Sequence, residues 1–126
     1  PFTKTVFALE PVSSFRRFIK DKAKKENITN VFSLDGFLDS IPLPDNSADF
    51  LMTSNAIGWN LEYELKEIER VLKPNGQAIH LLLDPGGKSE NPLHKVLTSS
   101  PWQYSLKEID YENSLKLKYF KTVKKE

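Results

Sequence analysis

The sequence predicts a three-layer α/β fold, built on a mostly parallel sheet that ends in an antiparallel hairpin. Three observations support this prediction. Short apolar runs alternate with helix-like segments over residues 3–84, which is typical of parallel strands joined by right-handed crossovers. Two segments near the C-terminus alternate apolar and polar residues, as strands with one solvent-exposed face do. The length of 126 residues suits one core, so residues 1–126 are expected to form a single domain.

Three expected strands lie in the first half of the chain. Their segments are TKTVFALEP (3–11), TNVFSLD (29–35) and DFLMTSN (49–55). The first contains the apolar run from Val6 to Leu9, which predicts a strand buried on both faces. Prolines and turn residues between the second and third segments predict a loop.

A helix expected over residues 12–27 combines an apolar face with a basic one. Ser13 or Ser14 can act as its N-cap. The apolar residues recur at helical spacing, and they are Val12, Phe15, Phe18, Ile19 and Ala23. The basic residues predict a solvated face rather than a nucleic-acid footprint, and they are Arg16, Arg17, Lys20, Lys24 and Lys25.

A second helix and strand follow, with a marked boundary between them. Periodic apolar residues predict a helix over 61–72, and the segment QAIHLLLD predicts a strand over 77–84. Pro74 lacks the amide that would continue the helix, and Asn75-Gly76 tolerates the positive φ of a sharp turn. His80 in this strand is expected to be a packed core residue.

The C-terminal third is expected to close the sheet. Residues 91–100 hold a short helix at most. Segments 104–111 and 114–120 flank Glu112-Asn113 and alternate in polarity, which predicts an antiparallel hairpin.

Composition narrows the class of protein. With 18 basic and 17 acidic residues, the net charge of +1 gives no electrostatic case for binding nucleic acid or an anionic membrane. The absence of cysteine excludes disulfides and thiolate chemistry and is compatible with a reducing cytosol, so a cytoplasmic location is expected. No apolar run approaches the roughly 20 residues of a membrane helix. No His, Asp and Glu cluster has metal-ligand spacing, so no metal is expected.

Three motifs occur in a definite order. Glu10 stands at the tip of the first strand, in VFALEP. The segment LDGFLDSIPLPDNSADFLMTSN covers residues 34–55, and EIERVLKPNGQ covers residues 67–77. The last two resemble the patterns Asp, then Leu-Pro-Phe-x-Asp-x-Ser-Phe-Asp, and Glu-x-x-Arg-Val-Leu-Lys-Pro-Gly-Gly. Both patterns belong to class I S-adenosylmethionine-dependent methyltransferases of the type 11 kind. The resemblance covers residues 5–85 and implies a three-layer Rossmann-like methyltransferase sheet.

The resemblance implies S-adenosylmethionine as cofactor and assigns residues to its nucleoside end. Glu10 would accept hydrogen bonds from both ribose hydroxyls, and Asp35, at the tip of the next strand, would accept from the adenine amino group. Gly36 and Phe37 would offer backbone and apolar contacts to the adenine ring. Because the loop after Asp35 is longer than the family pattern, Asp39 is an alternative to Asp35.

At the other end of the cofactor, the turn from Ser54 to Trp59 would face the methionine portion and the methyl acceptor. Asn55 is expected to bind the cofactor there. Trp59 is expected to bind the acceptor, for which a small molecule is the candidate. Chemistry in this family depends mostly on placing the acceptor in line with the sulfonium methyl, and no catalytic residue is assigned.

The family's Gly-rich loop after its first strand has no counterpart in the sequence. In the family that strand lies between the strands expected here at Val6 and Phe50, so two strands would lack a partner. Three arrangements are open: a remainder of a longer methyltransferase, direct pairing of the two strands, or a strand supplied by another chain or by a second copy in a homodimer. The expected function is methyl transfer to an unidentified acceptor. The alternative is a non-catalytic methyltransferase-like relic or interaction module.

Overall fold

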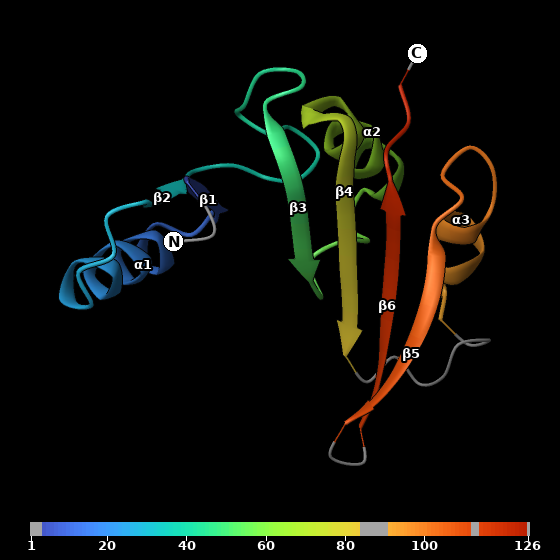
Figure 1. The fold of residues 1–126 in the computed structure, drawn as a ribbon. Coiled ribbons are helices and arrows are strands. Elements are labelled where there is room, and N and C mark those ends of the chain that lie inside the picture. Colours follow the sequence, from blue (N-terminus) through green and yellow to red (C-terminus); the bar gives the residue numbers. More distant parts are fainter. Residues whose placement is uncertain (1–3, 84–90, 112–113, 126) are drawn as a thin grey trace.

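The structure of the protein, a computed structural model, describes residues 4–83, 91–111 and 114–125 (Figure 1). Helices and strands follow one another in the expected order. They are β1 (Val6–Leu9), α1 (Ser13–Lys25), β2 (Val31–Leu34), β3 (Ala48–Ser54), α2 (Leu61–Val71), β4 (Leu72–Leu83), α3 (His94–Thr98), β5 (Ser105–Tyr111) and β6 (Ser114–Thr122).

The strands form two sheets. β1 and β2 pair in parallel, with Leu9 opposite Leu34. The larger sheet has the order β3-β4-β6-β5, in which β3 and β4 are parallel and β6 runs antiparallel to both of its neighbours. Parallel strands joined by helices, with a closing antiparallel hairpin, confirm the expected α/β fold class.

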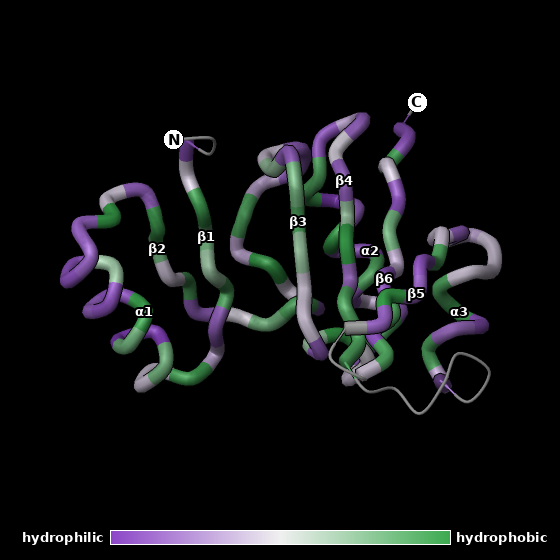
Figure 2. The backbone as a smooth tube through the Cα atoms, turned by 60° about the horizontal axis from the view of Figure 1, so that its bottom comes forward, coloured by the Kyte–Doolittle hydropathy of each residue, from purple (hydrophilic) through white to green (hydrophobic). Residues whose placement is uncertain are grey.

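β1 and β3 are not joined to each other. Among the described strands, β1 pairs with β2 alone and β3 with β4 alone, so the direct pairing considered above does not occur. Figures 1 and 2 show β1, β2 and α1 standing apart from the edge of β3. Each of these two strands thus has one edge without a ladder partner, at the place where the family's first strand is expected to be missing.

The core lies on one face of the larger sheet. Alternate residues of the paired strands point to this face, such as Leu51 of β3, which lies opposite Ala78 of β4. Each large side chain buried in this way contributes about 1.5–3 kcal/mol relative to exposure. On the other face, Phe50 and Met52 of β3 are exposed. The buried apolar residues are Ile41, Ile57, Leu65, Ile68, Val71, Leu72, Ala78, Leu82, Leu97, Trp102, Tyr104, Leu117, Tyr119 and Val123.

The smaller sheet is less buried than the sequence predicts. Val6 and Phe7 are exposed, so the expectation of a strand buried on both faces is wrong for β1. On α1, Phe15 and Phe18 are more than half exposed, and Ala23 alone of the expected apolar face is buried. The physical reason is that a two-stranded sheet offers a helix little surface to cover.

The start of α1 also differs from expectation. The N-cap is Val12, and no side chain caps the helix, so neither Ser13 nor Ser14 has the predicted role. The helix begins with backbone bonds instead, in which the amides of Phe15 and Arg16 donate to the Val12 carbonyl oxygen.

β4 begins directly after α2, five residues earlier than the sequence predicts. Between Leu72 and Gln77 the strand bulges, because Ala48 lies opposite Leu72 whereas Phe50 lies opposite Gln77. A Cβ on Gly76 would be 2.9 Å from a backbone carbonyl oxygen, which excludes a side chain there. Asn75 has the expected positive φ, at 69°, but the Pro-Asn-Gly stretch forms a bulge within a strand rather than the expected turn between helix and strand.

The Glu-x-x-Arg segment of α2 fastens the loop between β2 and β3. The Arg70 guanidinium donates to the carbonyl oxygens of Ile41 and Leu43, each at 2.9 Å. It also pairs with Glu67 at 2.6 Å and with Asp45 at 2.8 Å. The hydrogen bond from Arg70 lowers the pKa of Glu67, and the bonds to both carboxylates raise the pKa of Arg70. The connection between the two sheets is thus tied down by α2.

Candidate functional site

Two predicted site residues meet at the carboxyl end of the smaller sheet. Glu10 follows β1 and Asp35 follows β2, and because Leu9 lies opposite Leu34 the two acidic residues are adjacent. The Glu10 amide donates to the Leu34 carbonyl oxygen at 2.9 Å, which continues the ladder to the strand tip. Parallel pairing therefore places both acidic residues at one edge, where open α/β sheets bind ligands.

Arg16 lies between these acidic residues, which the sequence does not predict. Its Nη1 donates to the carbonyl oxygens of Glu10 at 3.0 Å and Pro11 at 2.9 Å, and lies 3.1 Å from Asp35 Oδ1. The expectation that Arg16 belongs to a solvated face is therefore wrong. The sequence signal for this role is the position of Arg16 in the first turn of α1. A long side chain at that position can reach back to the end of β1.

The residues predicted to bind the nucleoside differ in how exposed they are to a ligand. Glu10 Oε2 accepts from the Val12 amide at 3.1 Å, and Glu10 Oε1 has no hydrogen-bond partner among the described residues. Phe37 is exposed. Gly36 is enclosed, because a Cβ there would lie 3.0 Å from the Leu9 side chain. Gly36 thus serves close packing beneath the site, while Glu10 and Phe37 remain accessible to a ligand.

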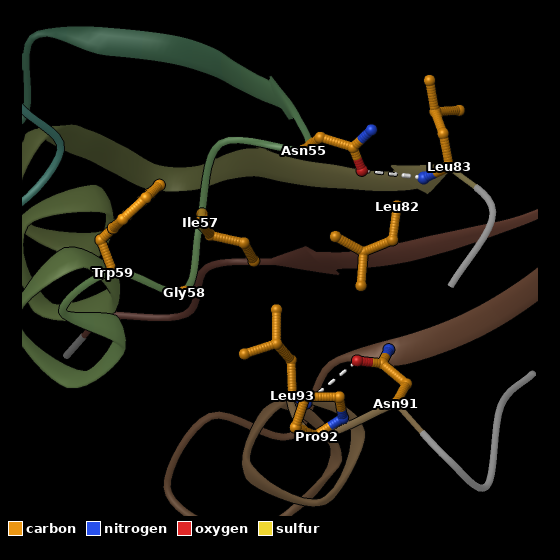
Figure 3. A pocket seen from close by; sticks show the side chains of 9 residues that line it. All are labelled: Asn55, Ile57, Gly58, Trp59, Leu82, Leu83, Asn91, Pro92 and Leu93. Carbon is orange, nitrogen blue, oxygen red and sulfur yellow. Dashed lines mark hydrogen bonds between the residues drawn. The ribbon is translucent and has the colours of Figure 1, made fainter. Parts of the chain in front are cut away.

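A pocket beyond the carboxyl ends of β3 and β4 brings together Asn55 and Trp59 (Figure 3). Its volume is about 370 Å³, and Ile57, Leu82 and Leu93 supply much of its apolar lining. Asn55 has a positive φ of 49°, and its Oδ1 accepts from the Leu83 amide at 2.9 Å. Asn55 is therefore fixed at the end of β3 with its side chain tied to β4.

Glu64 is a residue of this site that the sequence analysis missed. It is only 4% exposed, and its two carboxylate oxygens accept from the Gly58 amide at 2.8 Å and from the Asn60 amide at 3.1 Å. Trp59 lies between these two amides, so Glu64 fixes the turn that carries the indole. The signal was an acidic residue near the start of a helix that begins after an asparagine. Glu64 accepts from the N-cap amide as the glutamate of a capping box does, but it stands one residue later in the helix.

Hydrogen-bonded polar groups are buried in the core of the larger sheet. His80 is fully buried, as expected for a packed core residue, with Nδ1 2.7 Å from Thr53 Oγ1 and Nε2 3.1 Å from the Tyr104 hydroxyl. Burial lowers the pKa of His80 to about 4 and raises the pKa of Tyr104. The Asn91 Nδ2 donates to the Tyr119 hydroxyl at 3.0 Å, and burial raises the pKa of Tyr119.

The predicted residues thus form two groups rather than one. Glu10 and Asp35 lie at the end of the smaller sheet, and Asn55 and Trp59 lie at the end of the larger one. Asp39, the alternative to Asp35, accepts from Asn60 Nδ2 at 3.1 Å. This bond ties the loop after the first group to the turn of the second.

The described residues form neither a metal site nor a membrane-spanning helix. Among residues 4–83, 91–111 and 114–125, no group of three or more His, Asp and Glu side chains could hold a metal ion. No helix within these ranges is long and apolar enough to cross a bilayer. Every buried side-chain nitrogen and oxygen described there has a hydrogen-bond partner, so no orphaned polar atom marks a further ligand.

The fold and the family match define a Rossmann-like α/β domain of the methyltransferase class. A family model described as a methyltransferase domain matches residues 1–80, and the chain belongs to this family. A SAM-dependent methyltransferase from Aquifex aeolicus is 17% identical, with 92% of this chain and 68% of that chain covered and a TM-score of 0.71. Geranyl diphosphate methyltransferase in complex with SAM is 9% identical, with 94% and 68% covered and a TM-score of 0.75. The [4+2]-cyclase SpnF is 11% identical, with 95% and 67% covered and a TM-score of 0.74.

Proposed function

We propose that the protein acts in methyl transfer from S-adenosylmethionine to a small-molecule acceptor. The observation that supports this most is the adjacency of Glu10 and Asp35 at the carboxyl ends of two parallel strands. Glu10 Oε1 is free to accept from ribose hydroxyls in charge-assisted hydrogen bonds. Asp35 and the exposed ring of Phe37 are assigned to the adenine, and Gly36 packs beneath them.

The second group of residues is assigned to the methionine portion and the acceptor. When bound, the cofactor supplies an activated sulfonium methyl group, and the protein supplies orientation. Asn55 Nδ2 has no hydrogen-bond partner among the described residues, so it can donate to the methionine portion. Trp59 is assigned to the acceptor, beside the same pocket.

We also propose that a further strand completes the sheet between β1 and β3. Among the described strands, β1 and β3 each have one edge without a partner, and a further strand would pair with the backbone groups along those edges. The strand belongs either to a longer form of the protein or to another chain, including a second copy. In this proposal residues 1–126 make up most of one domain.

Calorimetric titration with S-adenosylhomocysteine tests the proposed cofactor site. We expect saturable binding that Glu10→Ala weakens at least about tenfold, because charge-assisted hydrogen bonds contribute about 1.5–3 kcal/mol each. Glu26→Ala removes the same charge from the exposed end of α1 and should leave the affinity unchanged. Absent or millimolar binding that Glu10→Ala does not alter would contradict the proposal.

A non-catalytic interaction module is the second candidate, and the unpaired edges of β1 and β3 favour it. The likeness to SpnF, described as a [4+2]-cyclase, illustrates that this fold does not by itself determine methyl transfer. An interaction module would bind a partner strand without any nucleoside. The titration above separates the two candidates.

A further inference from the structure

We infer that the methyl acceptor is an uncharged molecule with a flat, apolar portion that packs against Trp59 at the pocket of Figure 3. This inference depends on the proposed function, because an acceptor exists only if the protein transfers a methyl group. It adds the chemical class of the acceptor, and the observations below support it independently of the nucleoside end.

Trp59 is exposed on a turn that is itself firmly fixed. Its side chain is 92% exposed, whereas a tryptophan usually buries most of its surface and contributes stability by doing so. The amides of Gly58 and Asn60, on either side of it, both donate to the buried Glu64 carboxylate. An exposed ring on an anchored turn is preorganised to pack against a ligand.

The floor of the pocket beside Trp59 is apolar and closely packed. Ile57 is buried, and Leu82 and Leu93 lie across from it (Figure 3). Gly58 has a φ of 121°, and a Cβ there would lie 3.4 Å from the Leu93 side chain, so glycine lets the turn approach this leucine. The volume of about 370 Å³ falls in the range of small-molecule pockets, roughly 300–1,000 Å³.

The described lining offers no charge to an acceptor. None of the described residues that line the pocket is ionisable. Asn91 uses its amide groups inside the protein, because Nδ2 donates to the Tyr119 hydroxyl and Oδ1 accepts from the Leu93 amide, both at 3.0 Å. Asn55 is assigned to the cofactor. Among the described lining residues, a charged acceptor would find no partner to replace the hydration that it loses, which favours an uncharged acceptor.

Fluorine NMR of protein labelled with 5-fluorotryptophan tests the inference without any cofactor. The chain has two tryptophans in opposite environments, because Trp102 is only 6% exposed. The probes are naphthalen-2-ol, which is flat and uncharged, and naphthalene-2-sulfonate, which adds a charge to the same rings. We expect naphthalen-2-ol to shift the Trp59 resonance saturably and to leave the Trp102 resonance in place. Its Kd should be at least about tenfold lower than that of the sulfonate.

Matched variants complete the experiment. Trp59→Ala, followed by calorimetry, should weaken naphthalen-2-ol binding about tenfold. Tyr63→Ala removes another exposed ring four residues away and should leave the affinity unchanged. An unmoved Trp59 resonance, or equal affinity for the sulfonate, would overturn the inference even if S-adenosylhomocysteine binds. Naphthalen-2-ol bound at Trp59 with no binding of S-adenosylhomocysteine would instead contradict the proposed function, and with it the acceptor role of this pocket.

Discussion

His80 and its neighbours make the interior of the larger sheet sensitive to protonation. The ring is buried between Thr53 and Tyr104, and burial lowers its pKa to about 4 from 6.5. Lys121 lies over the Tyr104 ring and pairs with Glu69, so charged groups stand close by. Because the folded state keeps His80 neutral, the unfolded state binds a proton that the folded state does not bind between about pH 6.5 and pH 4.

We therefore expect the free energy of unfolding to fall by about 2 kcal/mol between pH 7 and pH 5, through His80 alone. The loss should continue toward pH 4 and level off below it. Urea unfolding at the two pH values measures this. The pKa of Glu67 is lowered from 4.5, so its contribution is lost mainly below this window. A His80→Gln protein that still showed the full loss between pH 7 and pH 5 would contradict the assignment.

Glu64 gives a second expectation for a single residue. Glu64→Leu leaves two backbone amides without their acceptor, at a cost of about 1–3 kcal/mol each, so we expect the unfolding free energy to fall by about 2–6 kcal/mol. Glu62→Leu, on the exposed side of the same helix, should change it by less than about 0.5 kcal/mol. Urea unfolding compares the two. Equal effects would show that Glu64 does not anchor the turn.

Residues differ in how far the sequence predicts their place. Glu10 and Asp35 could be placed together because acidic residues directly after parallel strands share one edge of the sheet. Arg16 and Glu64 could not, because their partners depend on how a neighbouring turn folds over the helix. Whether Glu10, Asp35, Asn55 and Trp59 bind ligands stays a prediction.

Among the elements, α2 not only packs against the core but also binds the loop between β2 and β3. Arg70 and Glu67 hold the loop between the two sheets. We expect Arg70→Ala to lower the unfolding free energy by about 2–3 kcal/mol, because it leaves the part-buried Glu67 carboxylate without its cation. Amide hydrogen exchange over residues 41–47 should become faster, which measures the loosened loop directly.

Lys66→Ala is the matched control for this change. Lys66 also pairs with a carboxylate from α2, that of Glu62, but on the exposed side of the helix. Such exposed pairs contribute about 0–1 kcal/mol, so little effect is expected on stability and none on exchange in the loop. Unchanged exchange in the Arg70→Ala protein would refute the role of α2 in holding the connection.

The local periodicity of the sequence predicts which helices and strands form. It predicts less well where they begin and end, and which of their faces are buried. The hairpin of β5 and β6 could be predicted because the alternation of apolar and polar residues along a strand is visible in the local sequence alone. The start of β4 was not, because its bulge depends on distant partners. The Asn75 amide donates to the Val123 carbonyl oxygen, and the Val123 amide donates to Gly76, both at 2.8 Å. The exposure of α1 was missed because amphipathicity indicates a face to be covered, not what covers it.

At the scale of the whole molecule, the exposed face and the edge of β3 are where we expect association to occur. Phe50 is 49% exposed and Met52 is 59% exposed, next to unpaired backbone groups. We expect the 126-residue chain to self-associate as its concentration rises, and a Phe50→Lys, Met52→Lys protein to associate less. Sedimentation velocity measures this. Gln103→Lys, at an exposed position just before β5, is the control for added charge. A monomer at all concentrations would contradict this expectation.

The gap beside β1 and β3 also has a thermodynamic consequence. A strand that pairs with both edges fixes the position of the smaller sheet relative to the larger one, and so it fixes the spacing between Glu10 and Asn55. If its insertion tightens nucleoside binding by some factor, reciprocity requires the nucleoside to tighten strand binding by the same factor. If such a strand inserts, each of the two ligands therefore binds more tightly when the other is already bound.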